Sequence, residues 1–163
     1  MSVDKAQPAT VLTDKAQSSS APSATVLVVD DNTDAVDIIA RLLAQHGLTA
    51  IRAYSGKECL YIVRSRPVDV IILDVMMPEM DGLEVCRQLK QMSPTPPVIL
   101  LTAKDDMATR SAGMLLGVSE FVVKPVNKRD LIARIQTQLS TRQWEREIDQ
   151  TSAAIDLSKK SED

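Results

Sequence analysis

Aromatic side chains are scarce in this 163-residue chain, where they make up 2% of the residues. The whole stock is Tyr54, Tyr61, Phe121 and Trp144. Single-stranded nucleic acids are commonly bound by stacking bases on aromatic rings, so the sequence gives little support to that class of function. A large excess of charge of one sign is also lacking, since the chain has 19 basic and 22 acidic side chains. No basic patch is visible in the sequence either, so we expect no direct nucleic-acid partner.

Cysteines and long apolar runs are few as well. Cys59 and Cys86 have no CxxC spacing and fall in apolar helical patterns, which predicts buried reduced thiols rather than a disulfide framework or a zinc site. No apolar stretch approaches the roughly 18 residues that a membrane span needs, and the N-terminus lacks the apolar segment of a secretory signal. We therefore expect a cytoplasmic protein without a membrane span.

The sequence divides into three parts. Residues 1–24 are rich in Ser, Ala, Thr, Pro and Gln, which predicts a disordered leader, and the short DKAQ and ATVL repeats there indicate no function. Residues 25–140 hold the apolar segments of a single compact domain. Residues 141–163 are polar but helix-permissive, so we expect a C-terminal helical extension, ending near residue 150, and a tail. Trp144 and Ile148 form a short apolar stripe there, with no heptad pattern sustained beyond one turn.

Short apolar runs alternate with segments of helical spacing within residues 25–140. Three of the runs are continuously apolar, as expected of strands buried on both faces of a parallel sheet. The runs cover residues 25–29, 48–53, 68–73, 97–101 and 119–123. The helical segments between them begin at candidate N-caps (Asn32, Ser55, Asn127) or end at candidate C-terminal glycines (Gly47, Gly117). The pattern predicts a doubly wound α/β domain, a five-stranded parallel sheet flanked by five helices.

Polar side chains follow four of the five runs, at the point where each run ends. Asp30 and Asp31 follow the first, Asp74 the third, Thr102 the fourth and Lys124 the fifth. Ligands of open parallel sheets bind outside the carboxyl ends of the strands. The sequence therefore predicts one polar site built from four strands.

The chemistry of that site follows from its charges. Three carboxylates a few ångströms apart repel one another by roughly a few kcal/mol, so they must take up protons or hold a cation. Hard oxygen ligands favour Mg²⁺, which shares its coordination sphere readily with phosphate. Lys124 and Thr102 then supply a charge and a hydroxyl to phosphoryl oxygens. The turn after the first strand, DDNTD, has no glycine, which excludes a dinucleotide fingerprint and a P-loop.

These residues resemble the receiver domain of two-component response regulators. The resemblance rests on VLVVDDN at 26–32, ILDVMMPEMDG at 72–82, LLTAK at 100–104 and FVVKP at 121–125, in the family's order and spacing. It implies a flavodoxin-like, CheY-like fold with strand order 2-1-3-4-5. It also implies that Asp74 accepts a phosphoryl group from a sensor histidine kinase or a histidine phosphotransfer protein.

The resemblance further assigns the other site residues. Asp30, Asp31, Asp74 and the backbone carbonyl of Met76 would hold Mg²⁺. Lys124 would bind phosphate, and its bond to Pro125 is often cis in the family. Thr102 and Phe121 would be a switch pair, which alters the surface formed by about residues 105–140 after phosphorylation. A downstream protein target would bind to that surface. A phosphorylation-dependent homodimer through the same surface is an open alternative.

Plainer interpretations exist for each residue. Asp30 or Asp31 could cap a helix, Thr102 could cap the fourth helix, Lys124 could be a solvated lysine, and Phe121 could be permanently buried. His46, the sole histidine, precedes Gly47 near a helix end, where it is better explained by helix capping than by catalysis.

Three functions compete at this stage. A stand-alone receiver without an output domain is favoured, and the alternative is a receiver within a longer regulator whose output domain lies after residue 163. The third is a Mg²⁺-dependent phosphohydrolase with an aspartyl-phosphate intermediate, but Met76 stands where such enzymes carry a general acid. Since Met76 also cannot orient water, we expect no enzyme activity beyond self-catalysed phosphoryl acceptance and self-dephosphorylation that takes minutes or longer.

Overall fold

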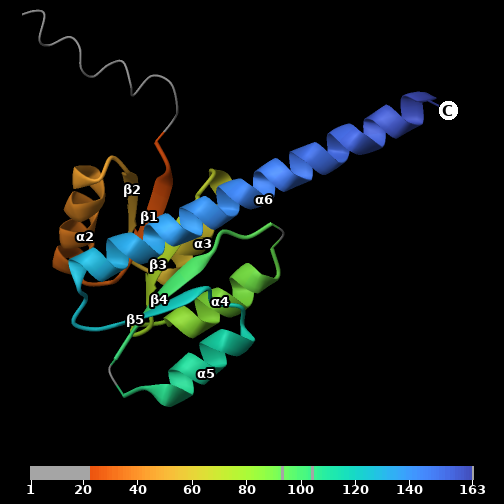
Figure 1. The fold of residues 1–163 in the computed structure, drawn as a ribbon. Coiled ribbons are helices and arrows are strands. Elements are labelled where there is room, and N and C mark those ends of the chain that lie inside the picture. Colours follow the sequence, from red (N-terminus) through yellow and green to blue (C-terminus); the bar gives the residue numbers. More distant parts are fainter. Residues whose placement is uncertain (1–22, 93, 104, 163) are drawn as a thin grey trace, which may run out of the picture.

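Five parallel strands form the centre of the computed structural model, which describes residues 23–92, 94–103 and 105–162. The strands are β1 (Thr25–Val29), β2 (Thr49–Ala53), β3 (Val70–Asp74), β4 (Val98–Thr102) and β5 (Glu120–Val123). The helices are α2 (Thr33–Gln45), α3 (Gly56–Ser65), α4 (Gly82–Lys90), α5 (Met107–Leu115) and α6 (Lys128–Glu162). The order β2-β1-β3-β4-β5 confirms the predicted flavodoxin-like sheet (Figure 1).

The two faces of the sheet are covered by different helices. Alternate strand residues such as Leu73 and Leu100 pack under α3, α4 and α5. Their neighbours, such as Ile72 and Leu101, pack under α2 and the first turns of α6. β3 and β4 are buried at every position because both faces of the sheet are covered, and their side chains are apolar except at the last residues, Asp74 and Thr102. The continuous apolar runs in the sequence are explained by this two-sided burial.

Helix ends lie where the sequence predicts them. The side chains of Asn32 and Ser55 accept hydrogen bonds from the first turns of α2 and α3, and Asn127 accepts one from the N–H of Asp130 in α6. Gly47 follows α2 with a φ of 75°, a conformation that residues with a Cβ rarely adopt. His46 is the C-cap of α2, and its Nδ1 lies 3.0 Å from the carbonyl oxygen of Leu42, in agreement with the capping interpretation.

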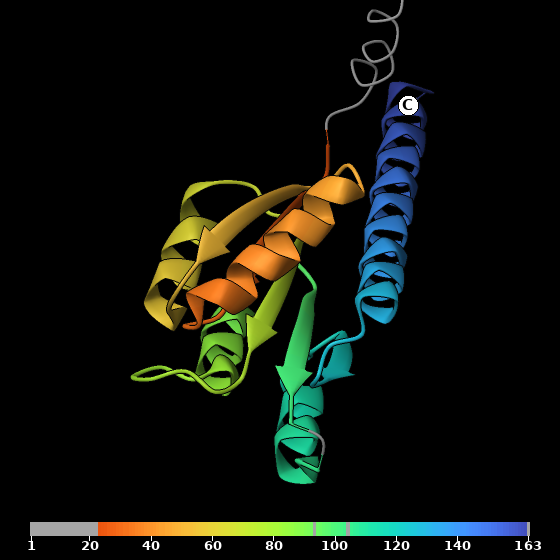
Figure 2. The ribbon, with the colours of Figure 1, turned by 90° about the vertical axis from the view of Figure 1, so that its left-hand side faces the viewer.

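The C-terminal helix differs from the prediction. α6 does not end near residue 150 but continues to Glu162 as a single helix. Figures 1 and 2 show its last turns extending away from the sheet and its covering helices. The predicted leader lies mostly outside the described residues, since the described chain begins at Ser23, whose neighbour Ala24 accepts a hydrogen bond from Thr49 at the start of β2.

Two smaller predictions can also be checked. Cys59 and Cys86 are free and buried, as expected, and burial is the main cause that raises the pKa of each thiol to about 12. Among the helices described, none combines the length and the apolar character that crossing a lipid bilayer requires.

Candidate functional site

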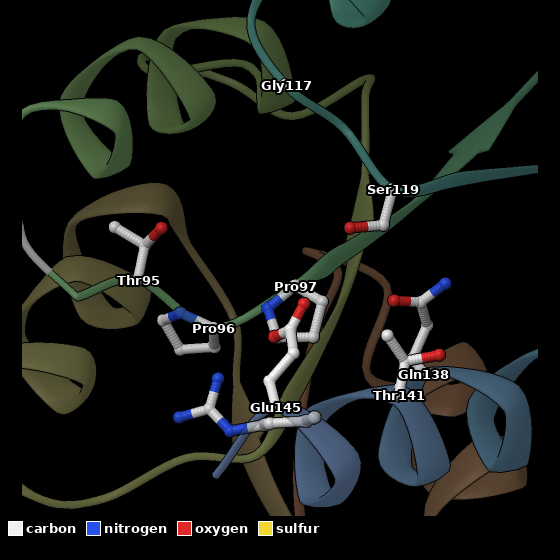
Figure 3. Close-up of a pocket in the computed structure, with 9 residues that line it drawn as sticks. Thr95, Pro96, Pro97, Gly117, Ser119, Gln138, Thr141 and Glu145 are labelled. Atoms are coloured by element: carbon white, nitrogen blue, oxygen red, sulfur yellow. The ribbon is translucent and has the colours of Figure 1, made fainter. Parts of the chain in front are cut away.

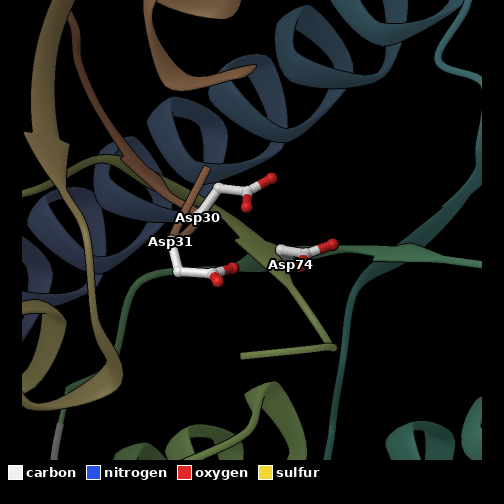
Figure 4. A group of neighbouring side chains, drawn as sticks. All are labelled: Asp30, Asp31 and Asp74. Carbon is white, nitrogen blue, oxygen red and sulfur yellow. The ribbon is translucent and has the colours of Figure 1, made fainter. Parts of the chain in front are cut away.

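Three aspartates meet at the carboxyl edge of the sheet. Asp74 is the last residue of β3, and Asp30 follows β1, which pairs with β3. Carboxylate oxygens of Asp30, Asp31 and Asp74 all lie within 4.8 Å of one another. Asp30 and Asp74 are buried, whereas Asp31 is exposed, and Figure 4 shows the three side chains pointing to the same side. The structure thus brings together the acidic residues that the sequence predicts.

Local hydrogen bonds orient Asp30 toward this cluster. Its backbone N–H donates to the carbonyl of Ala53, and its Oδ1 accepts from the N–H of Asn32 at 3.0 Å. The N-cap of α2 is Asn32, whose Oδ1 accepts from Asp34 and Ala35. The interpretation of Asp30 or Asp31 as a helix cap is therefore wrong.

The electrostatics of the cluster favour a bound cation. Burial raises the pKa of Asp30, and the nearby charges of Asp74 and Asp31 raise it further, while the N–H of Asn32 and the charge of Lys124 oppose the shift. An ionised Asp30 is thus destabilised in the folded protein unless positive charge compensates it. A carboxylate oxygen from each of three residues within 4.8 Å is a donor set that suits a hard divalent ion such as Mg²⁺.

Lys124 provides a positive charge at the same place. Its Nζ forms an ion pair with Oδ1 of Asp74, an oxygen that otherwise accepts no hydrogen bond from the described residues. The backbone N–H of Lys124 donates to the carbonyl of Thr102 at 2.8 Å, which ties the end of β5 to the end of β4. The Lys124–Pro125 bond is cis, as predicted. Lys124 is accordingly not a solvated lysine but a partner of Asp74.

Thr102 is the last residue of β4, the strand that pairs with β3, and its hydroxyl is buried. The residue is 1% exposed, and its Oγ1 has no hydrogen-bond partner among the described residues. It does not cap the next helix, because the N-cap of α5 is Asp106, whose side chain accepts from the N–H of Thr109. A buried hydroxyl left unpaired costs about 1–3 kcal/mol, and the role of Thr102 as a phosphate ligand and switch residue stays a prediction.

Phe121 lies on the face of the sheet that α5 covers. It is partly buried against the core beside its strand neighbour Leu100, with the guanidinium of Arg110 5.7 Å from the ring centre. Its side chain is therefore neither fully buried nor fully exposed to solvent. Its role as a rotameric switch stays a prediction. Met76 lies in the loop after β3, and its side chain is exposed. The assignment of its backbone carbonyl as a metal ligand also stays a prediction.

Two glycines contribute to the site and were not singled out from the sequence. A Cβ on Gly82 would lie 2.6 Å from the carbonyl oxygen of Asp74, and the N–H of Gly82 donates to the carbonyl of Val75 at 2.8 Å. The loop after β3 therefore packs directly on the backbone of Asp74. The second is Gly113, against which the ring of Phe121 packs. The Asp-Gly pair at 81–82 was the available signal for the first, and no sequence signal distinguished the second.

A separate cavity of about 240 Å³ lies at the opposite edge of the sheet (Figure 3). It is lined by residues 95–97 before β4, by Gly117 and Ser119 before β5, and by residues 138–145 of α6. It contains none of the predicted site residues, and ligands of such sheets bind at the other edge. The aspartate cluster is therefore the candidate functional site.

Comparison with known proteins agrees with this geometry. Residues 26–136 match the sequence model of the response regulator receiver domain. The chain belongs to this family. Receiver domains hold Mg²⁺ at an acidic pocket and interact with kinases and phosphotransfer proteins, and the matched region of this chain contains the aspartate cluster described above.

Individual relatives show the same receiver region. The response regulator MprA of Mycobacterium ulcerans is 37% identical over 136 residues, covering 83% of this chain and 59% of the relative. The alkaline phosphatase synthesis transcriptional regulatory protein PhoP of Bacillus subtilis is 38% identical over 114 residues, covering 70% and 48%. A receiver domain protein from Clostridium thermocellum of known structure has a TM-score of 0.70 at 31% identity, covering 74% and 98%. The chain thus spans roughly half the length of these curated relatives.

Proposed function

We propose that this receiver domain accepts a phosphoryl group on Asp74 in a Mg²⁺-dependent reaction with a phosphohistidine. The observation that carries the proposal is the meeting of three carboxylates within 4.8 Å with Lys124 paired to Asp74. A carboxylate that is crowded by like charges and contacted by a lysine suits an acceptor whose reaction brings more negative charge into the site.

The transfer exchanges one bond for another. An oxygen of Asp74 attacks phosphorus in line and forms an acyl phosphate, while the bond between phosphorus and the imidazole nitrogen of the donor breaks and the imidazole keeps the electron pair. Asp30, Asp31 and Asp74, with the backbone carbonyl of Met76, would hold Mg²⁺, which supplies neutralising charge to the phosphoryl oxygens. Lys124 exchanges its contact with the carboxylate for one with a phosphoryl oxygen.

Thr102 and Phe121 would convert this local change into a change of surface. The unpaired hydroxyl of Thr102 gains a partner when it donates to a phosphoryl oxygen, which favours movement of Thr102 toward Asp74. The ring of Phe121 then turns further inward. The changed face comprises α5, β5 and the first turns of α6, about residues 105–140, and a downstream protein would bind there.

The partners follow from the same chemistry. The donor is a sensor histidine kinase or a histidine phosphotransfer protein, and the receiver acts by contact with a protein rather than with nucleic acid. The relatives extend well beyond the matched region, so both a stand-alone regulator and a regulator with a further output domain are compatible with the same switch.

Intact-mass measurement tests the proposal. The protein is incubated with Mg²⁺ and acetyl phosphate, a small phosphoryl donor, and we expect the mass to rise by one phosphoryl group. Asp74→Asn should abolish the gain, while Asp37→Asn, which alters an exposed aspartate paired with Arg52 on the surface, should leave it intact. Equal labelling of Asp74→Asn, or no labelling of the wild type, would refute the proposal.

A further inference from the structure

The first residue of α4 lies against the backbone of the proposed phosphoryl acceptor. Gly82 is buried, and a Cβ built on it would lie 2.6 Å from the carbonyl oxygen of Asp74 and 2.9 Å from Cα of Val75. Real Cβ atoms essentially never approach a neighbour within 3.0 Å. The atoms it would meet belong to the backbone and cannot rotate away, as the end of a side chain can. The N-terminus of α4 therefore reaches the end of β3 only because residue 82 has no side chain.

Glycine is needed at this position for space rather than for its backbone freedom. The glycines with positive φ in the described chain are Gly47 and Gly117, which follow α2 and α5, and Gly82 is not one of them. It occupies the first position of α4, directly after the N-cap Asp81, where residues with a side chain adopt the helical backbone without strain. The close approach to Asp74 is what requires a glycine here.

A hydrogen bond closes the loop between β3 and α4 at the same place. The N–H of Gly82 donates to the carbonyl oxygen of Val75 at 2.8 Å, so residues 75–82 form a loop whose two ends meet beside Asp74. Val75 is buried in the core, and Met76, whose backbone carbonyl is a predicted metal ligand, follows it with an exposed side chain. Gly82 therefore contacts both the backbone that carries the acceptor carboxylate and the residue next to Met76.

We propose that Gly82 is a positioning residue for Mg²⁺ binding and for phosphoryl acceptance. It sets where the carboxylate of Asp74 and the carbonyl of Met76 lie relative to the other two aspartates. The inference rests on the proposed function. Mg²⁺ requires near-ideal octahedral geometry and tolerates displaced ligands poorly. A side chain at position 82 would push the backbone of Asp74 by at least a few tenths of an ångström, which is enough to disturb such a site.

A matched comparison exists in the preceding helix. α3 also begins with a buried glycine, Gly56, directly after its N-cap. A Cβ on Gly56 would lie 2.8 Å from Cγ2 of Val85 and 3.0 Å from Cγ and Sδ of Met80. The overlap is nearly as close as at Gly82, but these atoms belong to side chains, and the thioether of Met80 is flexible. Gly56→Ala thus imposes a similar crowding without pressing on the backbone of Asp74.

The Mg²⁺ affinity of Gly82→Ala tests the proposal. Binding is measured by isothermal titration calorimetry on the unphosphorylated protein, at a temperature where urea unfolding in a chelator shows each variant to be folded. We expect Gly82→Ala to bind Mg²⁺ about tenfold more weakly than the wild type, the size of effect typical of residues behind metal ligands. Labelling by acetyl phosphate should then need correspondingly more Mg²⁺. Gly56→Ala should lose stability but keep the wild-type affinity. Wild-type affinity in Gly82→Ala, or an equal loss in both variants, overturns the proposal.

A second pair of variants covers the case in which Gly82→Ala does not fold. The side chain of Asp81 accepts a hydrogen bond from the N–H of Glu84 at 2.9 Å and caps α4. Asp81→Ala and Asp81→Asn remove the same charge, but only alanine removes the capping acceptor, so only alanine loosens the turn that holds Gly82 against Asp74. Asp81→Ala should therefore bind Mg²⁺ several-fold more weakly than Asp81→Asn. Equal affinities of these two variants overturn the proposal when Gly82→Ala is unfolded.

The outcome is distinguishable from that of the proposed function. If the wild type gains a phosphoryl group and Asp74→Asn does not, while Gly82→Ala binds Mg²⁺ as the wild type does, phosphoryl acceptance stands and the positioning role fails. If the wild type binds Mg²⁺ but gains no phosphoryl group, the proposed function fails, and the Mg²⁺ affinity of Gly82→Ala still decides the positioning role. A wild type that binds no Mg²⁺ overturns both.

Discussion

The ring of Phe121 occupies the space that a side chain on Gly113 would need. A Cβ built on Gly113 would lie 2.9 Å from Cε1 and 3.1 Å from Cζ of the Phe121 ring, and 3.3 Å from a methyl group of Leu100. Gly113 lies inside α5, where a glycine costs helix stability. Because Thr102 is two residues beyond Leu100 in β4, this contact joins α5 to the predicted switch pair, Thr102 and Phe121.

Replacement of Gly113 by alanine should show this contact in the free energy of unfolding. In an unobstructed helix, Gly→Ala stabilises by about 0.5–1 kcal/mol. Here the overlap with Phe121 should outweigh that gain, so we expect Gly113→Ala to destabilise by about 1 kcal/mol in urea unfolding. In a Phe121→Ala background, which removes the overlapping atoms, the same substitution should become stabilising. A stabilised single variant would show that the ring moves aside without cost.

Thr102→Val should separate stability from function. Valine keeps the shape of threonine but removes a buried hydroxyl that has no partner among the described residues, so the free energy of unfolding should rise by about 1 kcal/mol. Phosphoryl acceptance from acetyl phosphate, or binding of beryllofluoride, should fall at the same time. Thr109→Val is the matched control. It should lower the free energy of unfolding, because the hydroxyl of Thr109 donates a hydrogen bond to Asp106 at 2.5 Å. A destabilised Thr102→Val would mean that its hydroxyl is satisfied in solution.

Relative to the wild type, Asp30→Asn should be more stable without Mg²⁺ and less stable with it. In a chelator the substitution removes one buried charge from a cluster of three, and thermal unfolding should shift upward by an amount equivalent to about 1 kcal/mol. With saturating Mg²⁺ the wild type gains stability by binding the ion, and the variant should gain much less. Asp37→Asn should show neither effect. Equal Mg²⁺ stabilisation of wild type and Asp30→Asn would remove Asp30 from the metal site.

The sequence allowed the site to be predicted because burial and chain direction both constrain it. Apolar runs that are buried on both faces identify parallel strands, and parallel strands deliver the residues after them to one edge. Asp30, Asp74, Thr102 and Lys124 were predicted in this way, although the strand boundaries shifted so that Asp74 and Thr102 end their strands rather than follow them.

Other features depend on contacts that no local pattern encodes. The close approaches of Gly82 to the backbone of Asp74 and of Gly113 to Phe121 join residues from different elements, so spacing along the chain does not show them. The continuation of α6 to Glu162 was missed because its sequence after Arg146 is polar and has only a short apolar stripe.

Met76 should make the phosphorylated state long-lived. Its side chain is 72% exposed beside the acceptor and has only a thioether, a poor group for orienting water. We expect the acyl phosphate to decay over minutes or longer after acetyl phosphate is removed, followed by intact mass with Mg²⁺ present. Met76→Asn, which adds a donor and an acceptor at the same place, should shorten the lifetime by several-fold. A half-life of seconds in the wild type would contradict this expectation.

The two cysteines should make stability depend on alkaline pH. Burial raises the pKa of Cys59 and of Cys86 from 9.0 to about 12, so the folded protein keeps both thiols neutral where the unfolded chain ionises them. Their contribution is fully present below pH 9 and is lost progressively as the pH rises from about 9 to 12. The double substitution Cys59→Ala and Cys86→Ala should flatten this decline, although the lost packing should lower the stability near neutral pH.

In the native wild type, labelling by iodoacetamide at pH 8 should be much slower than in urea, and rapid native labelling would show that the thiols reach solvent by local opening.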